Sequence, residues 1–362
     1  MVSRLFLGVV MKLDYIKITN FRNFTRITIP RFSRVNMLIG ENGSGKTNFL
    51  EAIQTLSTLT PLRPVGFPEL IRWSADFFHL HGEFDGHTVE LGFSEKKRLL
   101  KLDGDKSAKS NLARIAPVVA FMPDDIDIIR GTPENRRMFL DRALSAIDPQ
   151  YEAAIRRYYR TLRQRNAQFK LNPRDVPIWD AELISWGSMI IMKRLPYIRV
   201  LNDKIRELYR ELYGKEIRIR YMNPFRIEGS VEESFRDAVK NGAREELRRR
   251  CTLFGPHRDN FSIQMEDKNT NAFVSQGQLR SLAFALKLGV VRSIEDSSGG
   301  RPILLIDDVL LEIDEPRREQ ILDMISRDYQ IFFTMTNGAL FRRAFDDCSV
   351  FQVSGGDISL SG

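Results

Sequence analysis

Short apolar runs and alternating apolar and polar residues dominate the chain from about residue 12 to residue 121. Turn pairs such as Asp85-Gly86 and Asp103-Gly104 separate them. Successive side chains of a strand point to opposite faces, and Asp-Gly favours tight turns between strands, so this pattern predicts a strand-rich lobe. The runs are residues 15–18, 26–29, 35–39, 88–93 and 117–121.

The hydrophobic period becomes helical from about Thr132. Thr132 is a suitable N-cap and Pro133 suits the first helical position, which predicts a helix that ends at about Ser145. Further helices are predicted over residues 149–170, 177–213, 231–240 and 243–250.

Past Cys251 the pattern is again mixed, with two buried-strand candidates at residues 302–306 and 330–334. A chain of 362 residues exceeds the usual limit of one hydrophobic core. We therefore predict an α/β protein with a split head domain, residues 11–130 plus 251–362, interrupted by a helical arm, residues 131–250.

A complete G-x-x-x-x-G-K-[ST] motif lies between the strand-like run 35–39 and a helix-like run 48–53. Glycines let backbone N–H groups face phosphate oxygens, and the helix adds its positive N-terminal end. The motif predicts binding of a nucleoside triphosphate, with lysine on the β and γ phosphates and threonine on Mg²⁺. Its residues are Gly40, Glu41, Asn42, Gly43, Ser44, Gly45, Lys46 and Thr47.

The strand candidate 302–306 leads into two acids, Asp307 and Asp308. The order of a Walker B element assigns the first carboxylate to Mg²⁺ and the second to the attacking water. Acidic ends are common on buried strands, so the position of this pair, 260 residues after Thr47, is what makes the assignment persuasive.

Ser275, Gly277 and Gln278 open a helix whose apolar face recurs at helical spacing. A hydroxyl and bare backbone N–H groups at a helix N-terminus favour an anion, whereas an ordinary polar cap explains the same residues without a ligand. Apolar positions are Leu279, Leu282, Ala283, Leu286 and Val290.

The order P-loop, S-x-G-Q and acidic-ended strand resembles the ATP-binding cassette superfamily. That resemblance implies a two-fold dimer with ATP between the subunits, in which Ser275 of one copy senses the γ-phosphate held by the other.

Further segments resemble the RecF family of bacterial recombination and gap-repair proteins. They include NFRNF at residues 20–24, FMPDD at 121–125, GPHRD at 255–259 and the run from Asp307 to Asp314. The resemblance implies a head like that of structural-maintenance-of-chromosomes ATPases, with a short helical arm in place of a long coiled coil. It also implies ATP-dependent dimerisation, DNA binding, slow hydrolysis, and cooperation with RecO and RecR to load RecA.

By the same resemblance, Arg22 matches a basic residue that contacts phosphate, although a surface arginine is an equal alternative. Thr336 stands where many cassette ATPases carry a switch histidine. Without that histidine, we expect Asp308 to activate the water.

Positive charge is concentrated in the predicted arm. Residues 151–250 hold 23 Lys and Arg against 14 Asp and Glu, a net of +9 in a chain of net +8. If arginines of the arm line one face, phosphate contacts would make DNA binding strongly salt-dependent, whereas pairing with nearby acids is the alternative. The candidates are Arg156, Arg157, Arg160, Arg163 and Arg165.

Two distant cysteines, Cys251 and Cys348, give neither a disulfide framework nor zinc-site spacing, which suits a reducing cytoplasm. No apolar run reaches the ~20 residues that span a bilayer. Residues 1–10 are expected to be a non-native or mis-started extension before Met11. Two alternatives remain open: the ATPase subunit of a membrane transporter, and a nucleotide-dependent structural protein with negligible turnover.

Overall fold

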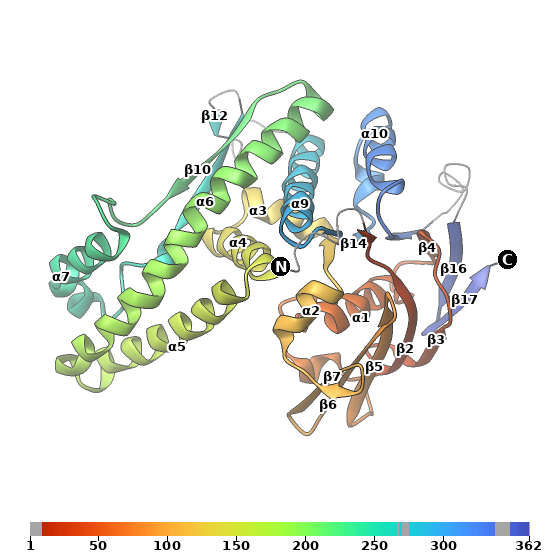
Figure 1. The fold of residues 1–362 in the computed structure, drawn as a ribbon, viewed down its shortest axis with the longest axis horizontal. Helices are drawn as coiled ribbons and strands as arrows, with labels where there is room; N and C mark the ends of the chain where they lie inside the picture. The colour runs from red at the N-terminus through yellow and green to blue at the C-terminus, as the bar shows by residue number, and fades with distance from the viewer. Residues whose placement is uncertain (1–8, 266–267, 270–274, 337–347, 362) are drawn as a thin grey trace. The chain divides into compact units, whose positions relative to one another are not determined.

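The computed structural model describes residues 9–265, 268–269, 275–336 and 348–361, and it divides the chain into two compact units (Figure 1). The first unit joins Met1–Asp124 to Val290–Gly362, and the second is Asp125–Gly289. The predicted interruption of one unit by another is therefore present. The second unit extends beyond the predicted residue 250, because β10 (Ile217–Met222) pairs with β11 (Asn260–Met265) and keeps the chain after Cys251 with the arm.

A six-stranded sheet in the order β17-β16-β4-β15-β14-β9 forms the centre of the first unit. Its strands are parallel except β17, which pairs antiparallel with β16. Four of its strands are buried along their whole length and are mostly apolar, as the apolar runs predict. The bounds are β4 (Val35–Ile39), β9 (Val118–Phe121), β14 (Ile303–Asp307), β15 (Ile331–Met335), β16 (Cys348–Ser354) and β17 (Asp357–Ser361).

An antiparallel sheet in the order β3-β2-β5-β6-β7-β8 completes the predicted strand-rich lobe. Helix α1 (Lys46–Thr58) shares one hydrophobic core with both sheets, through Phe49, Leu50, Ile53 and Leu56. This packing holds the end of the helix that follows the P-loop. The strands are β2 (Leu13–Phe21), β3 (Phe24–Ile29), β5 (Phe77–Phe84), β6 (His87–Ser94), β7 (Lys97–Leu102) and β8 (Asp105–Lys106).

Helix α9 (Gln276–Ser298) begins in the second unit and ends in the first. Further elements of the first unit are β1 (Val9–Val10), η1 (Phe67–Leu70), α2 (Lys109–Ile115), β13 (Gly300–Arg301), η5 (Val309–Glu312) and α10 (Glu315–Ser326).

The second unit is mainly helical, as predicted, with α5 packed along α6 and β10 along the same helix (Figure 1). Thr132 caps α4 and Asp148 caps α5 through side-chain hydrogen bonds to backbone N–H groups. The bounds are α3 (Asp127–Arg130), α4 (Pro133–Ile147), α5 (Pro149–Leu171), η3 (Pro173–Trp179), α6 (Asp180–Tyr213), α7 (Val231–Arg249) and β12 (Lys268–Asn269).

One helix prediction is wrong. Residues 231–240 and 243–250 were expected to form two helices, yet α7 is continuous from Val231 to Arg249. Gly242 lies inside it, and a methyl group there would come within 2.2 Å of the Phe254 ring. Glycine at this position therefore serves close packing rather than a chain break.

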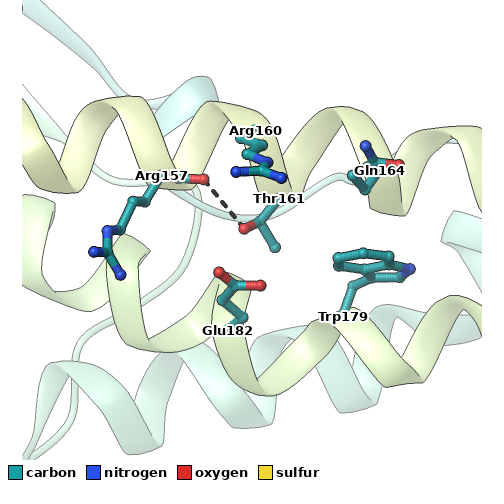
Figure 2. A pocket seen from close by; sticks show the side chains of 6 residues that line it. All are labelled: Arg157, Arg160, Thr161, Gln164, Trp179 and Glu182. Atoms are coloured by element: carbon teal, nitrogen blue, oxygen red, sulfur yellow. Dashed lines mark hydrogen bonds between the residues drawn. The ribbon is translucent and has the colours of Figure 1, made fainter.

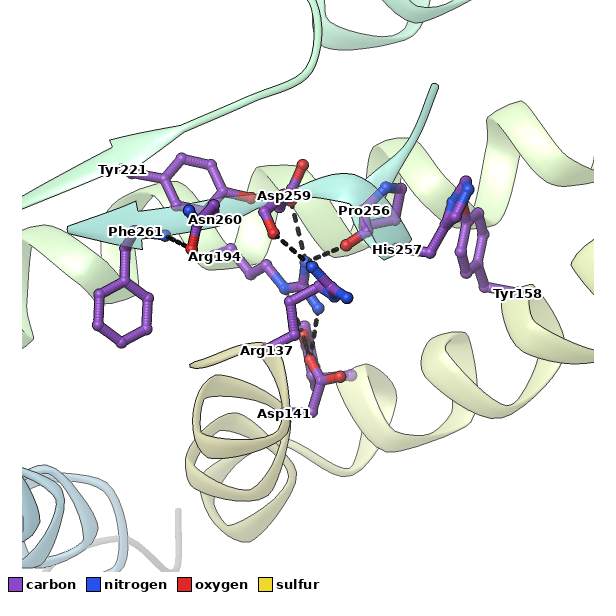
Figure 3. Close-up of polar contacts among 11 residues, drawn as sticks. Arg137, Asp141, Tyr158, Arg194, Tyr221, Pro256, His257, Asp259, Asn260 and Phe261 are labelled. Atoms are coloured by element: carbon purple, nitrogen blue, oxygen red, sulfur yellow. Dashed lines mark hydrogen bonds and ion pairs between the residues drawn. The ribbon is translucent and has the colours of Figure 1, made fainter. Parts of the chain in front are cut away.

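A buried polar cluster ties the second unit together around Arg194 (Figure 3). Its guanidinium is fully buried and donates to Asp259 Oδ2 at 2.9 Å, to Asp141 Oδ1 at 2.6 Å and to the Pro256 carbonyl at 2.8 Å. Tyr221 also donates to Asp259. Because Asp141 lies on α4, Arg194 on α6 and Tyr221 on β10, the GPHRD segment becomes the point where separate elements meet.

His257 of the same segment is a structural residue. Its Nδ1 shares a hydrogen bond with the Tyr158 hydroxyl at 2.6 Å, and its Nε2 lies 3.1 Å from the Thr252 carbonyl. Burial lowers the pKa of His257 to about 4, so the ring stays neutral at physiological pH.

Replacing Arg194 should destabilise the second unit strongly. We expect Arg194→Ala to lower the free energy of unfolding by about 3–5 kcal/mol, because it leaves the buried Asp259 carboxylate without its cation. Arg199→Ala is the matched control, an exposed arginine on the same helix, and should change stability by less than about 0.5 kcal/mol. Equal midpoints for both variants in urea unfolding would contradict this account.

Candidate functional site

The predicted nucleotide residues gather at the carboxyl edge of the central sheet. β4 ends at Ile39 and leads into the P-loop, whereas β14 ends at Asp307. β15 lies between these two strands and runs parallel to both, so the ends of all three meet at one edge. This edge is where open α/β sheets bind their ligands.

Glycines shape the loop from Gly40 to Gly45. Gly43 and Gly45 have φ values of 81° and 118°, a left-handed backbone that side chains with a Cβ rarely adopt. At Gly40 a Cβ would come within 2.3 Å of the Val353 carbonyl. The loop therefore needs these glycines, and the binding of phosphate by its backbone N–H groups stays a prediction of the motif. Glu41 and Asn42 are exposed between them.

Lys46 begins α1 and folds back across the loop. Its Nζ donates to the carbonyls of Gly40 at 2.7 Å and Glu41 at 3.0 Å, and the side chain is buried. The ammonium is thereby held beside the loop backbone. Its contact with β and γ phosphates stays a prediction.

A hydrogen-bonded chain joins the P-loop helix to the end of β14. Thr47 Oγ1 donates to Asp307 Oδ2 at 2.8 Å, and Thr334 Oγ1 donates to Asp307 Oδ1 at 2.6 Å. Thr334 Oγ1 also accepts the N–H of Asp308 at 3.0 Å. The structure thus brings together the two residues that were predicted to ligate Mg²⁺.

Thr334 is a residue of the site that was not predicted from the sequence. It ends the apolar strand candidate 330–334, and it pairs in register with Asp307 across β14 and β15. The sequence signal that could have identified Thr334 is a hydroxyl residue at the end of a buried strand candidate that follows the Walker B strand.

Asp308 follows Asp307 in a left-handed conformation with φ of 53°. Among the described residues its buried Oδ1 has no hydrogen-bond partner. Burial raises the pKa of the Asp308 carboxyl, the adjacent Asp307 carboxylate raises it further, and Lys46 opposes both. A strained, unpartnered carboxylate next to the predicted Mg²⁺ ligand is suited to accept a proton from water.

Asn23 is a second residue that sequence reasoning did not place in the site. From the turn between β2 and β3 it donates to the Ser44 carbonyl at 3.1 Å and accepts from Asn48 Nδ2 at 2.9 Å. A Cβ on Gly45 would lie 2.5 Å from Asn23 Nδ2. Asn23 therefore buttresses the loop, and its place in the NFRNF segment was the only signal.

Arg22 has protein partners in this structure. Its Nε and Nη2 bond the two carboxylate oxygens of Glu51 at 2.7 and 3.2 Å, and its Nη1 donates to the Glu69 carbonyl at 2.9 Å. Glu51 is fully buried on α1, so the pair fixes the β2 turn to the P-loop helix. All three nitrogen atoms are engaged, and contact between Arg22 and phosphate stays a prediction.

The S-x-G-Q residues form a capping box at the start of α9. The Ser275 hydroxyl accepts the N–H of Gln278 at 3.3 Å, and Gln278 Oε1 accepts the N–H of Ser275 at 3.1 Å. The polar-cap interpretation is thus correct for the single chain. Ser275 and Gly277 are also exposed, and a Cβ on Gly277 would meet nothing within 4 Å, which leaves room for a second subunit.

Four of the five DNA-binding candidates on α5 are exposed: Arg156, Arg157, Arg160 and Arg163. The fifth prediction is wrong. Arg165 is buried, and its guanidinium pairs with Asp180 at 2.8 Å and Glu246 at 2.7 Å and donates to Thr252 at 2.8 Å. Because its cation is neutralised inside the second unit, Arg165 is a packing residue and does not contact DNA.

The chain's own residues fit ATP and Mg²⁺. The glycine loop provides the phosphate cradle, and Thr47 and Asp307 place a hydroxyl and a carboxylate oxygen together. Over the described ranges no group of three His, Cys, Asp or Glu side chains could hold a metal. Phosphate oxygens and water would complete the shell of an Mg²⁺ ion held by Thr47 and Asp307. In the same ranges no helix is both long and apolar enough to cross a membrane.

Comparison with known proteins gives consistent similarities. The family described as RecF/RecN/SMC N terminal domain matches residues 12–359. The DNA replication and repair protein RecF of Exiguobacterium sp. is 33% identical over 369 residues, covering 96% of this chain and 99% of that protein. The RecF protein of Clostridium tetani is 33% identical over 364 residues, with the same coverage of 96% and 99%.

Solved structures that resemble this chain belong to the same group of proteins as the sequence relatives. A structure of the recombination mediator protein RecF with ATP, from the RecFOR pathway, matches with a TM-score of 0.90 and 27% identity over 100% of both chains. An Smc head domain from Pyrococcus furiosus matches with a TM-score of 0.54 and 16% identity, covering 97% of this chain and 96% of that one, which shows the shared fold. The expected α/β fold of an ABC and SMC-like ATPase head with an inserted helical arm is confirmed.

Asp308→Asn should separate nucleotide binding from hydrolysis. The amide cannot accept the proton of the attacking water, so we expect turnover to fall on the order of a hundredfold or more while ATP affinity is retained. In the parent protein the rate should rise with pH through a pKa above that of an ordinary aspartate, because the carboxylate is the active form.

Whereas turnover should rise with pH, the contribution of Asp308 to folding stability should fall. The pKa of Asp308 is higher in the folded state than in the unfolded state, so stability is lost as pH rises from the unfolded-state pKa through the folded-state pKa. Asp308→Asn should therefore keep or raise the thermal midpoint at neutral pH. Normal turnover in this variant, measured by phosphate release, would show that the catalytic assignment is wrong.

Proposed function

Since this chain belongs to the RecF family, within the RecF/RecN/SMC group, we propose that it is an ATP-dependent DNA-binding protein of recombinational gap repair and replication restart. The observation that carries the proposal is the contact between Thr47 and Asp307 at 2.8 Å. It joins the P-loop to the Walker B strand and leaves the Asp308 carboxylate beside them.

The proposed ATPase uses the residues of the sheet edge. Lys46 and the loop N–H groups bind the β and γ phosphates, while Thr47 and Asp307 hold Mg²⁺ and Thr334 fixes the Asp307 carboxylate. Bound Mg²⁺ would neutralise charge on the phosphates. Asp308 orients the attacking water and accepts its proton, at a slow rate and with stimulation by DNA.

Two copies of the chain form the active state in this proposal. Ser275 and Gly277 open α9 with an exposed hydroxyl and bare backbone, which suits contact with the γ-phosphate held by the second copy. Binding therefore joins the subunits and hydrolysis releases them. The arginines of α5 then contact the DNA backbone, at gaps or at junctions of single and double strands.

The partners follow from the relatives. The matched solved structure is of a recombination mediator in the RecFOR pathway. We extend this role to the present chain, with RecO and RecR as partners that help it to load RecA at single-strand gaps. Family membership speaks against the transporter alternative. A structural protein with negligible turnover remains the rival, and phosphate release in the presence of DNA separates the two.

The proposal predicts nucleotide-dependent and salt-dependent DNA binding. Fluorescence anisotropy on gapped, single-stranded and duplex DNA should show tighter binding with ATP than with ADP or without nucleotide. The logarithm of the DNA association constant should fall linearly with the logarithm of the salt concentration. The double variant Arg156→Ala, Arg163→Ala should reduce the steepness of this line by about 1 for each phosphate contact that is lost.

Lys46→Ala supplies the control, because it removes the phosphate-binding cation and leaves the arm unchanged. It should bind DNA equally with and without ATP. Equal DNA affinity of the parent protein in all nucleotide states, or no binding at all, would contradict the proposed function.

A further inference from the structure

A pocket of about 460 Å³ lies in the second unit, within the range of ~300–1,000 Å³ that is typical of small-molecule sites (Figure 2). α5 forms one wall, and the end of η3 and the first turn of α6 form the other. It is lined by Arg157, Arg160, Thr161, Gln164, Trp179 and Glu182.

The spacing of the residues on α5 explains the first wall. Arg157, Arg160 and Gln164 are separated by three and four positions, which places them on one face of the helix. Across from them Trp179 presents its indole and Glu182 its carboxylate, both directed toward α5 in Figure 2. Two cations, an aromatic ring, an amide and a carboxylate thus converge on one cavity.

Two charged side chains of this pocket have no ion-pair partner among the described residues. In the described part of the chain, Arg160 and Glu182 make neither an ion pair nor a side-chain hydrogen bond, and both are exposed. Arg157 is held in place by stacking on Trp186, with its guanidinium carbon 4.8 Å from the ring centre. Arg165, farther along the same helix, shows the contrast, because Asp180 and Glu246 neutralise it.

We propose that this pocket binds one unpaired nucleotide of single-stranded DNA, which rests on the DNA binding proposed above. Trp179 stacks on the face of the base, while Arg157 and Arg160 hold the flanking phosphates. Glu182 accepts a base N–H and Gln164 offers both a donor and an acceptor to the base edge.

The combination of groups selects this occupant. A phosphate alone would use the arginines, but it would gain nothing from the indole and would be repelled by Glu182. Paired bases in a duplex are stacked on each other, so their faces cannot reach Trp179. An unpaired nucleotide uses the ring, the cations and the carboxylate together, and a single-strand gap supplies such nucleotides.

The test compares two gapped duplexes that have the same phosphate charge, one with natural bases in the gap and one with abasic units. With ATP, the full-length protein should bind the natural gap on the order of tenfold more tightly, since stacking contributes ~1–3 kcal/mol per base. Trp179→Ala should abolish this preference while its affinity for the abasic gap stays within about twofold of the parent. Trp179→Phe should retain most of the preference.

Trp73→Ala is the matched control, because Trp73 is 91% exposed on the first unit and lines no part of this pocket. It should leave both affinities unchanged. In the unmodified protein, 5-iodouracil placed in the gap should photocrosslink to Trp179, a measurement that needs no variant.

Equal affinity of the parent protein for both gaps would overturn the nucleotide pocket and leave the proposed function standing. A base preference that survives in Trp179→Ala would also overturn it, by showing that the base is bound elsewhere. If the parent bound neither DNA, the pocket and the proposed function would fail together.

Discussion

The contact between Thr47 and Asp307 is the constraint on which the candidate site depends. It joins the first turn of α1 to the end of β14 across 260 residues of sequence, at 2.8 Å. The second unit lies between these two positions in the chain, so two segments of the first unit that are far apart in the sequence must come together to make the contact. Thr334, from the strand between them, holds the other oxygen of Asp307. The Asp307 carboxylate therefore keeps both hydrogen bonds only when α1, β14 and β15 are correctly placed.

The same constraint accounts for the chemistry assigned to Asp308. Its N–H is bound by Thr334 Oγ1 and its backbone adopts a left-handed conformation, which fixes the main chain of Asp308 directly after Asp307. Burial and that neighbouring charge raise its pKa, which suits a group that must take up a proton. The second unit has its own fixed centre, the buried Arg194 between Asp141 and Asp259. Each unit thus has a buried polar contact that joins residues far apart in the sequence, Thr47 with Asp307 in the first and Arg194 with Asp141 and Asp259 in the second.

The features that could be predicted from the sequence are those that depend on neighbouring residues. The P-loop, the buried strands and the capped helices were found because glycine spacing, apolar runs and caps act over a few residues. Long-range contacts were less accessible. Arg165 reads as one more exposed arginine until Asp180 and Glu246 come into place around it. Thr334 and Asn23 gave only weak signals, because a side chain that supports a site is recognised by what it touches. The division of residues 231–250 into two helices was wrong, because Gly242 inside α7 packs closely against Phe254 and does not break the helix.

In the proposed active state, ATP joins two copies of this chain through the exposed start of α9. Sedimentation velocity of the Asp308→Asn protein, with ATP and Mg²⁺, with ADP, and without nucleotide, measures this joining. We expect a dimer only with ATP. Once Ser275→Arg is added, we expect a monomer in all three conditions, with ATP binding to that monomer intact by equilibrium dialysis. A monomer in every condition without the Ser275 change, or a dimer that ignores nucleotide, would contradict it.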